Sequence, residues 1–339
     1  MSDTRLTRYS HGAGCACKLG PAELAQVLRS VHGHPATEHP DLLIGLSVAD
    51  DSGVYALGDG RALVQTVDIF TPVVDEPHDY GRIAAANALS DIYAMGGNPL
   101  TALTFLAWPR DELPFQVAGE VLRGGLDVMA QAGCTVVGGH SVDAPEPMFG
   151  YSVTGLVDAS SAVAISGACS GDILILTKPL GIGIVTTAIK RGFCPPDLAS
   201  TAIEQMAALN SISGAALIPG NAHAATDVTG FGLLGHLREM CEASGVAATI
   251  DSGRVPVLDG VRDLLAQGAW AGGSKRNLES VGDFVEARDV DIRVLADAQT
   301  SGGLLVALDP SDVDGYLAAV PGAVTIGEVS EGRGIRVLS

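Results

Sequence analysis

The stretch Ala62-Leu63-Val64-Gln65-Thr66-Val67-Asp68-Ile69, with the helical pattern from Tyr80 to Met95 that follows it, decides the fold prediction. The first segment is a largely apolar run of strand length, and Gly96-Gly97 closes the second. Similar segments lie on both sides of this pair. They are predicted strands from Leu42 to Val48, Leu100 to Trp108, Thr135 to Val137 and Gly150 to Val157, and a predicted helix from Pro114 to Ala132. Together they predict one α+β unit.

The second half of the chain repeats this alternation of strands and helices. Strands are predicted from Asp172 to Thr177, up to Asp227, from Val246 to Ile250, Leu304 to Leu308, Val324 to Val329 and Ile335 to Leu338; helices are predicted around Gly183 to Arg191, Ala199 to Leu217 and Gly232 to Ala243. A chain of 339 residues also exceeds what one hydrophobic core usually organises. We therefore predict an α+β protein with a lid and connector (1–41) and two domains (42–158 and 171–339), joined by a Ser-, Ala- and Gly-rich linker.

The charge balance restricts the kinds of partner. The chain has 39 Asp and Glu residues against 20 Lys and Arg, which gives a formal net charge of -19. This excess disfavours nucleic acid, because its phosphates need contacts from Lys and Arg. A triphosphate bound near so many carboxylates would need divalent cations between them.

Cysteine usage and hydropathy indicate the compartment. Only two of the six cysteines, Cys15 and Cys17, are close in sequence, so no disulfide framework is indicated. The first residues are polar and lack an apolar signal core, and charged residues such as Asp172 and Lys178 interrupt the longest apolar stretches. We expect a cytoplasmic protein that does not associate with membranes.

The amino-terminal segment, residues 1 to about 20, differs from the rest of the chain. It is rich in glycine, and Arg5, Arg8 and Lys18 against Asp3 give it a charge of +2. This composition is typical of a mobile lid. A short helical pattern from Ala22 to Val31 follows it.

The string His11-Gly12-Ala13-Gly14-Cys15-Ala16-Cys17-Lys18 places two thiols beside an ammonium group, which favours the thiolate. Three other interpretations remain. A zinc site would lack one or two ligands. A redox pair is more consistent with the string than zinc, although a single intervening residue strains the disulfide ring. Considered alone, the string also fits a loose tail with incidental thiols.

Aspartates recur where apolar runs end. They are Asp50 and Asp51 after Val48-Ala49, Asp68 after Val67, Asp91 after Leu89-Ser90, and Asp227 after Ala225-Thr226. Such carboxylates can converge on Mg²⁺, which takes a few carboxylates together with phosphate oxygens. Any single aspartate is equally well explained as a helix or turn cap. Asn87, four residues before Asp91, is expected on the same helix face.

Three glycine-rich motifs lie beside small polar residues. They are Gly138-Gly139-His140-Ser141, Gly230-Phe231-Gly232 and Thr300-Ser301-Gly302-Gly303. Turns of this kind let the backbone approach phosphate or ribose closely, although ordinary tight turns look the same. None matches a P-loop, and no Rossmann fingerprint opens a helix after a strand. Both familiar nucleotide folds are therefore disfavoured.

These motifs together resemble the selenide, water dikinases, also called selenophosphate synthetases. The likeness is most specific in Tyr9 to Lys18 and extends over nearly the whole chain. It continues through Asp50-Asp51, Thr66-Val67-Asp68, Ala86 to Gly97, Gly138 to Pro147, Thr226 to Gly232 and Gln299 to Gly303. Ala16, where a glycine is often found, and Ala298, where a proline is often found, depart from the pattern without removing a reacting group.

The resemblance implies an α+β fold like that of aminoimidazole ribonucleotide synthetase, with two domains, ATP in the cleft and a homodimer built through amino-terminal sheets. The implied reaction converts ATP, selenide and water to selenophosphate, AMP and orthophosphate. The product would serve as selenium donor for selenoproteins and selenium-modified tRNA. A selenium-delivery protein is a further implied partner.

Residue roles carry over in the same way. The resemblance makes Cys15 the essential thiol, a position occupied by selenocysteine in some relatives, and Lys18 the catalytic lysine. The implied Mg²⁺ ligands are Asp51, Asp91 and Asp227. The implied nucleotide-binding residues are Lys18, Asp50, Asp68, Asp91, Gly139, His140 and Ser141, of which the last three are expected to reach the ATP of the partner subunit.

Two rival classes are distinguishable. Another enzyme of the same fold group, such as a thiamine monophosphate kinase or an ATP-using amidine synthetase, would lack the Cys-x-Cys-Lys motif. A non-enzymatic thiol or metal carrier would need Cys15 and Cys17 but not the aspartates.

Overall fold

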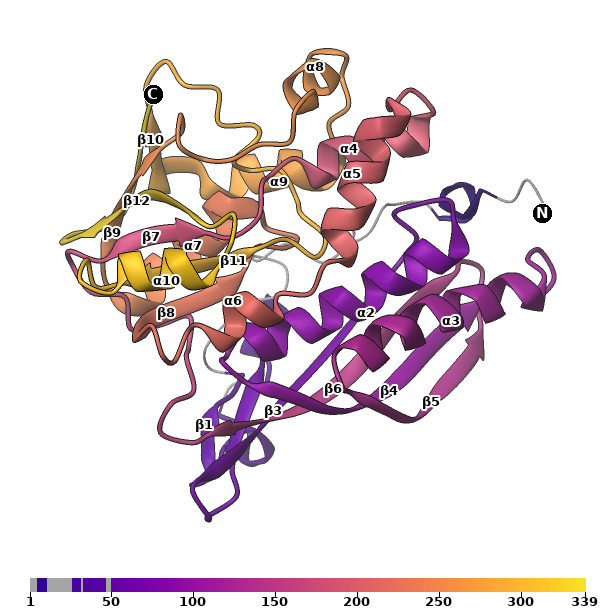
Figure 1. Cartoon of the computed structure of the whole chain (residues 1–339), viewed down its shortest axis with the longest axis horizontal. Helices are drawn as coiled ribbons and strands as arrows, with labels where there is room; N and C mark the ends of the chain where they lie inside the picture. Colours follow the sequence, from indigo (N-terminus) through magenta and orange to yellow (C-terminus); the bar gives the residue numbers. More distant parts are fainter. Residues whose placement is uncertain (1–4, 11–25, 32, 47–49) are drawn as a thin grey trace.

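The computed structural model of the chain describes residues 5–10, 26–31, 33–46 and 50–339. Its strands form two sheets, one in each half of the chain (Figure 1). The six-stranded sheet has the order β1-β2-β3-β6-β4-β5, and the seven-stranded sheet has the order β10-β13-β9-β12-β7-β11-β8. The mixture of helices with largely antiparallel sheets confirms the predicted α+β class.

The first half is a sheet covered on one face by two helices. Its strands are β1 (Leu42–Ile44), β2 (Gly53–Ala56), β3 (Arg61–Phe70), β4 (Asn98–Trp108), β5 (Thr135–Asp143) and β6 (Met148–Asp158). Helices α2 (Pro77–Ala94) and α3 (Phe115–Gln131) lie side by side on that face (Figure 1). Burial alternates along β3, so that Val64, Thr66 and Asp68 all lie on the covered face. The alternation therefore directs two polar side chains toward α2.

The second half surrounds the other sheet. Its strands are β7 (Ile173–Leu176), β8 (Ala222–Asp227), β9 (Ala247–Asp251), β10 (Val285–Ala287), β11 (Leu304–Leu308), β12 (Val324–Ser330) and β13 (Gly334–Leu338). Its helices are α4 (Ile182–Arg191), α5 (Pro196–Ala207), α6 (Ser211–Ala215), α7 (Gly232–Ser244), α8 (Val261–Ala266), α9 (Gly272–Val281) and α10 (Val313–Ala319). Three short 3₁₀ helices complete the described elements: η1 (Leu6–Tyr9), η3 (Pro35–Thr37) and η4 (Gly282–Phe284). Strand β11 is wholly apolar because it is buried between β7 and β8.

Helix α2 joins the two halves. It lies between the first sheet and the second half of the chain (Figure 1) and contacts α5, α6 and β8 as well as β3 and β6. The guanidinium of Arg82 on α2 pairs with Glu204 on α5 at 2.8 Å. Near the other end of α2, the Asn210 amide donates to Ser90 Oγ at 2.8 Å. Residues of both halves therefore meet along one helix.

Several predicted elements differ from the structure. Strand β1 ends at Ile44 instead of Val48, and β5 continues six residues beyond Val137 because it pairs with β4 up to Asp143. The single helix predicted from Ala199 to Leu217 is two helices, α5 and α6, separated where Asn210 turns its side chain toward α2. Elements that the sequence analysis did not predict are β2, β10, α8, α9 and α10.

Within the pattern predicted from Ala22 to Val31, residues 26–29 are helical and residues 22–25 lie outside the described part. Over the described ranges, no helix is both long and apolar enough to cross a bilayer. The division into domains at the predicted boundaries stays a prediction.

Candidate active site

Three aspartates from both halves of the chain act electrostatically on a fourth, Asp51. Asp50 and Asp51 precede β2, Asp91 lies on α2, and Asp227 ends β8. The pKa of the Asp51 carboxyl lies well above its usual range, first because it is buried and then because of the negative charges of Asp227, Asp91 and Asp50. The structure thus places Asp91 and Asp227 within electrostatic range of Asp51, although these three predicted metal ligands are up to 176 residues apart in sequence.

Hydrogen bonds fix Asp50 and Asp51 in this cluster. The Thr226 hydroxyl donates to Asp51 Oδ1 at 2.8 Å and so connects the loop before β2 to strand β8. Asp50 accepts from two backbone amides, those of Asp51 at 3.0 Å and Ile165 at 3.1 Å. Burial raises the pKa of Asp50, and these two amide hydrogen bonds partly offset the rise. Because both Asp50 oxygens have backbone donors, this residue holds the loop in place beside Asp51.

The inner face of β3 carries the rest of the site. The Thr66 hydroxyl donates to Asp91 Oδ2 at 2.5 Å, and the Asn87 amide donates to Asp68 Oδ2. Asn87 and Asp91 therefore face the same strand, as their spacing of four residues predicts. Asn87 Oδ1 also accepts from the backbone N–H of Ser301 at 2.7 Å, in the Gln299-Thr300-Ser301-Gly302-Gly303 loop. Asn87 is thus the link between Asp68 in the first half and this loop in the second.

Lys178 is a site residue that the sequence analysis missed. Its Nζ donates to the carbonyl oxygens of Ala208 at 2.7 Å and Ser301 at 3.2 Å. Burial lowers its pKa to about 7, although the charge of Asp227 acts in the opposite direction. The available signal was its position two residues after the apolar strand β7, which resembles the pattern used to select the aspartates. A basic residue at the end of an apolar run was not counted.

The donor set suits a hard divalent cation. Oδ2 of Asp51 is buried and has no hydrogen-bond partner among the residues that the structure describes. A buried carboxylate oxygen left in this state costs free energy unless a cation or donor reaches it. Asp51, Asp91 and Asp227 offer only oxygen ligands, which is the preference of Mg²⁺. The chemistry of these side chains therefore fits the predicted metal.

The glycines of the Gln299 to Gly303 loop serve the packing of the protein. A Cβ on Gly302 would lie 2.1 Å from the carbonyl oxygen of Val228, and one on Gly303 would lie 2.3 Å from the backbone nitrogen of Lys178. Close approach to neighbouring backbone thus requires both glycines. The adjacent Ser301 Oγ is buried and has no partner within the described ranges, so this hydroxyl is the group of the loop that can serve a ligand.

The Gly139-His140-Ser141 group lies elsewhere. The glycine-rich turn predicted here is wrong, because Gly138 to Ser141 belong to strand β5, where a Cβ on Gly139 would lie 2.0 Å from Thr104 Oγ1 of β4. In the order β3-β6-β4-β5, strand β5 lies three positions from β3, or about 14 Å. Within one chain, the structure does not bring His140 to Asp68.

Residues 5–10 of the amino-terminal segment are anchored to the rest of the protein. Leu6 is fully buried, the Arg5 Nε lies 2.7 Å from Asp75 Oδ2, and Lys190 Nζ of α4 donates to the carbonyl of Ser10 at 2.7 Å. Within the segment predicted to be a lid, residues 5–10 thus pack against both halves of the chain, and the mobility of the lid stays a prediction. Cys15, Cys17 and Lys18 lie outside the described residues.

Family models and solved structures define the class of protein. The model of the AIR synthase related protein N-terminal domain matches residues 49–157, and that of the C-terminal domain matches residues 170–338. The structure of AaThiL complexed with AMPPCP and TMP aligns with a TM-score of 0.70 at 19% identity, over 94% of this chain and 93% of that one. Hydrogenase maturation protein HypE in complex with ATP aligns with a TM-score of 0.65 at 19% identity, over 97% and 90%. The chain therefore has the two-domain fold of AIR synthase-related proteins, as predicted.

Sequence relatives define the family. A selenide, water dikinase of Aeromonas hydrophila is 50% identical over 310 residues, which cover 91% of this chain and 89% of the relative. One of Photorhabdus laumondii is 46% identical over 342 residues, covering 99% and 98%. The chain belongs to the selenide, water dikinase family and is a kinase-type enzyme. The resemblance stated from the motifs is confirmed.

Proposed function

We propose that this enzyme makes selenophosphate from ATP, selenide and water, and releases AMP and orthophosphate. The observation that carries the proposal is the convergence of Asp51, Asp91 and Asp227 from both halves of a chain whose relatives are named selenide, water dikinase. We extend the proposal to the use of the product as selenium donor for selenoproteins and selenium-modified tRNA. A cytoplasmic location and a selenium-delivery protein as partner belong to the same proposal.

Asp51, Asp91 and Asp227 would hold Mg²⁺, which would neutralise the charge on the phosphate oxygens. Thr66 and Thr226 orient two of these carboxylates, because each hydroxyl donates to one carboxylate oxygen. In Asp51 the other oxygen, Oδ2, is buried and has no partner among the described residues, so it is placed for a ligand. Thr66 acts on Asp91, and Thr226 acts on Asp51. The orientation of the site is thus supplied by two strands from different sheets, which lowers the cost of ordering it when ligand binds.

For the nucleotide, we propose contacts from Lys18, Asp50, Asp68 and Asp91. Asp68 is suited to a defined role because Asn87 donates to one of its oxygens, so that the carboxylate is held in one orientation. The Asn87 side chain in turn accepts a hydrogen bond from the backbone N–H of Ser301. The buried hydroxyl of Ser301 has no partner among the described residues and can bond to a ligand. The contacts from Asp68 through Asn87 to Ser301 would therefore couple nucleotide binding to both halves of the protein.

For the chemistry, we propose that Lys18 stabilises charge on the transferring phosphoryl group and that Cys15 holds the selenium nucleophile. The anchor at residues 5–10 supports this assignment, since it limits how far Lys18 can be from the described site. From Ser10 to Lys18 the chain spans at most about 29 Å. Closure of this segment over the nucleotide would exclude bulk water until hydrolysis of the remaining diphosphate.

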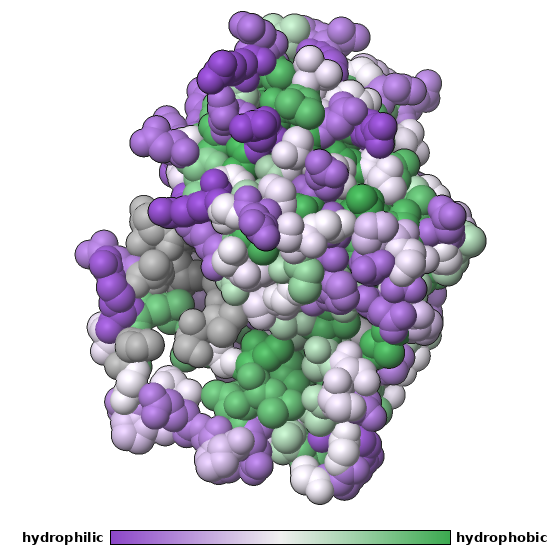
Figure 2. Space-filling view, turned by 90° about the vertical axis from the view of Figure 1, so that its left-hand side faces the viewer, coloured by the Kyte–Doolittle hydropathy of each residue, from purple (hydrophilic) through white to green (hydrophobic). Residues whose placement is uncertain are grey.

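A homodimer built through the first sheet is part of the proposal. The sheet face opposite α2 and α3 exposes large apolar side chains, among them Val67 (64%), Leu103 (49%) and Val137 (61%). Val67 and Leu103 both pair with Ser152 of β6, so they lie in one row across the sheet. Figure 2 shows hydrophobic side chains gathered low on the molecule, at the level of this sheet. Exposed apolar area of this kind favours a protein partner. In such a dimer, Gly139, His140 and Ser141 would reach the partner's ATP.

Phosphorus NMR of the products tests the reaction. With ATP, Mg²⁺ and selenide, we expect equal amounts of selenophosphate, AMP and orthophosphate, and no AMP without selenide. Cys15→Ser should abolish selenophosphate formation, whereas Cys194→Ser, a partly exposed thiol outside the site, should not. ADP as the nucleotide product would identify a different kinase of this fold. Selenium binding without ATP turnover would identify a carrier.

A further inference from the structure

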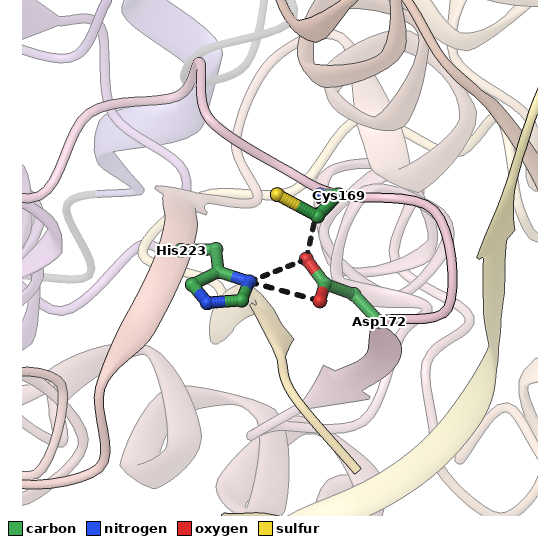
Figure 3. Close-up of side chains that lie close together, drawn as sticks. All are labelled: Cys169, Asp172 and His223. Atoms are coloured by element: carbon green, nitrogen blue, oxygen red, sulfur yellow. Dashed lines mark hydrogen bonds and ion pairs between the residues drawn. The ribbon is translucent and has the colours of Figure 1, made fainter.

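Cys169, Asp172 and His223 form a second cluster of ligating side chains (Figure 3). Cys169 and Asp172 lie on the segment that enters β7, and His223 lies near the start of β8. Asp227, at the other end of β8, is four residues away, or about 13 Å along the strand. The cluster is therefore separate from the acidic site.

The three side chains converge. His223 Nδ1 lies 2.9 Å from Asp172 Oδ1 and 3.0 Å from Asp172 Oδ2, and the backbone N–H of Cys169 donates to Oδ2 at 2.7 Å. One sulfur, one oxygen and one nitrogen of the three residues all lie within 4.8 Å of one another. Asp172 is buried, while Cys169 and His223 are exposed, so solvent reaches the cluster from one side.

The backbone beneath the cluster is fixed. Ala225 N of β8 donates to the carbonyl of Ala164 at 3.0 Å, and Ser244 Oγ of α7 accepts from the amides of Gly167 and Ala168 at 3.0 and 3.1 Å. A Cβ on Gly167 would lie 2.6 Å from the carbonyl oxygen of His223, so the segment runs against β8 as closely as glycine allows. The ligating residues are thus held on two pieces of backbone that cannot separate without loss of these contacts.

We propose that Cys169, Asp172 and His223 bind a Zn²⁺ ion whose fourth ligand is water. Thiolate, imidazole and carboxylate are the ligands of zinc, whereas Mg²⁺ prefers oxygen alone, so this site and the acidic site select different metals. Tetrahedral zinc holds such atoms about 3.2 to 3.8 Å apart, so no pair of ligand atoms has to close by more than about 1 Å. Rotation of the exposed Cys169 and His223 side chains is sufficient for this.

Binding exchanges contacts that are already weak or replaceable. The Cys169 thiol would release its proton to solvent and give up its 3.4 Å contact with the carbonyl of Gly167. His223 would exchange its bond to Asp172 for coordination by the same ring nitrogen, while Asp172 keeps the bond from Cys169 N. The ion would then connect the segment that enters β7 to β8 in the second sheet.

Cobalt substitution tests this site directly. The full-length protein with Cys15 and Cys17 changed to Ala, which removes the amino-terminal thiols, is titrated with Co²⁺. We expect one equivalent to bind with a thiolate-to-cobalt charge-transfer band, and Zn²⁺ to displace it. Cys169→Ala in this background should abolish the band, and His223→Ala should weaken Co²⁺ binding at least about tenfold. Cys194→Ala is the matched control and should change neither.

Two results would overturn the proposal. One is a charge-transfer band that survives Cys169→Ala or is lost equally in Cys194→Ala. The other is the lack of stoichiometric Co²⁺ or Zn²⁺ binding by the protein with Cys169 intact and reduced. Asp172→Asn adds a further check, because it keeps an oxygen that accepts from Cys169 N but removes the charge. It should weaken Co²⁺ binding at least about tenfold while the thermal midpoint of the metal-free protein changes little.

Discussion

Asp51 shows how one residue can couple stability to metal binding. Its pKa is raised by burial and by three neighbouring carboxylates, so ionisation at neutral pH costs the metal-free protein stability. This cost is absent below the unfolded pKa, near 3.8, and is complete above the folded pKa. We predict that Asp51→Asn raises the thermal midpoint of the metal-free protein at pH 7.5. It should also weaken Mg²⁺ binding at least about tenfold and lower kcat about 100-fold.

Thermal unfolding with and without Mg²⁺, together with turnover assays, measures these effects. Asp111→Asn, a change at an exposed aspartate on the loop before α3, should leave the midpoint and the Mg²⁺ response unchanged. A midpoint that falls in metal-free Asp51→Asn would show that this carboxylate is not repelled by its neighbours.

Lys178 changes stability with pH in the opposite direction to Asp51, because its destabilising effect declines as the pH rises. Its folded pKa of about 7 lies below the usual 10.5, so between these values the unfolded chain binds more protons than the folded one. The destabilisation caused by Lys178 is therefore full below pH 7 and declines as the pH rises toward 10.5. We predict that metal-free wild type gains stability relative to Lys178→Met between pH 6.5 and pH 9, by denaturant unfolding. Lys178→Arg, which stays charged, should show no such gain; a flat difference for Lys178→Met would contradict the prediction.

At the scale of elements, the anchor of the amino-terminal segment can be removed. Asp75 accepts from Arg5 Nε at 2.7 Å and from the amide and hydroxyl of Thr7 at 3.1 and 2.5 Å. We predict that Asp75→Ala releases residues 5–10, seen as faster amide hydrogen exchange there, and lowers kcat roughly tenfold because Lys18 is positioned less often. Asp79→Ala, which removes a nearby aspartate that pairs with Arg82 on α2 rather than with residues 5–10, is the control. If Asp75→Ala showed faster amide hydrogen exchange in residues 5–10 but an unchanged kcat, the anchor would have no role in catalysis.

The elements also show what the sequence could predict. Strands β3 and β11 were predicted within one residue, because alternation or a continuous apolar run marks them. Strand β5 was cut short because Gly138-Gly139 has the composition of a turn, while pairing with β4 decides its structure. The break between α5 and α6 depends on the bonds of Asn210 to Ser90 and Gly302, which are 120 and 92 residues away. Local pattern does not contain such contacts.

Some residues of the candidate site could be predicted from the sequence, whereas others required the tertiary structure. The aspartates could be selected from sequence because each ends an apolar run, and the structure brings Asp51, Asp91 and Asp227 within electrostatic range. Lys178 was missed, and the Asn87 to Ser301 contact joins residues 214 positions apart. The fold family supplied the roles, whereas convergence of the groups required the tertiary structure.

At the scale of the whole molecule, the exposed face of the first sheet should hold two chains together. We predict that Val67→Lys with Leu103→Lys raises the dimer dissociation constant at least about 30-fold, because two lysines would be buried in an apolar contact. Light scattering over a concentration series measures this. Phe115→Lys changes an equally exposed apolar residue on α3 and should leave the dimer intact. A wild type that is monomeric at all concentrations would contradict the prediction.

If Gly139, His140 and Ser141 serve the partner's nucleotide, each active site contains residues of two chains. His140 lies about 14 Å from β3 of its own chain, across two intervening strands, which is too far for both to touch one phosphate group. We predict that His140→Ala and Asp51→Asn each keep at most about one hundredth of the activity alone and that mixing them after reversible dissociation restores activity. Random pairing makes half of the dimers mixed, and each mixed dimer has one intact site, so recovery should reach about a quarter of wild type. A mixture that stays inactive although mass spectrometry finds mixed dimers would place His140 in the site of its own chain.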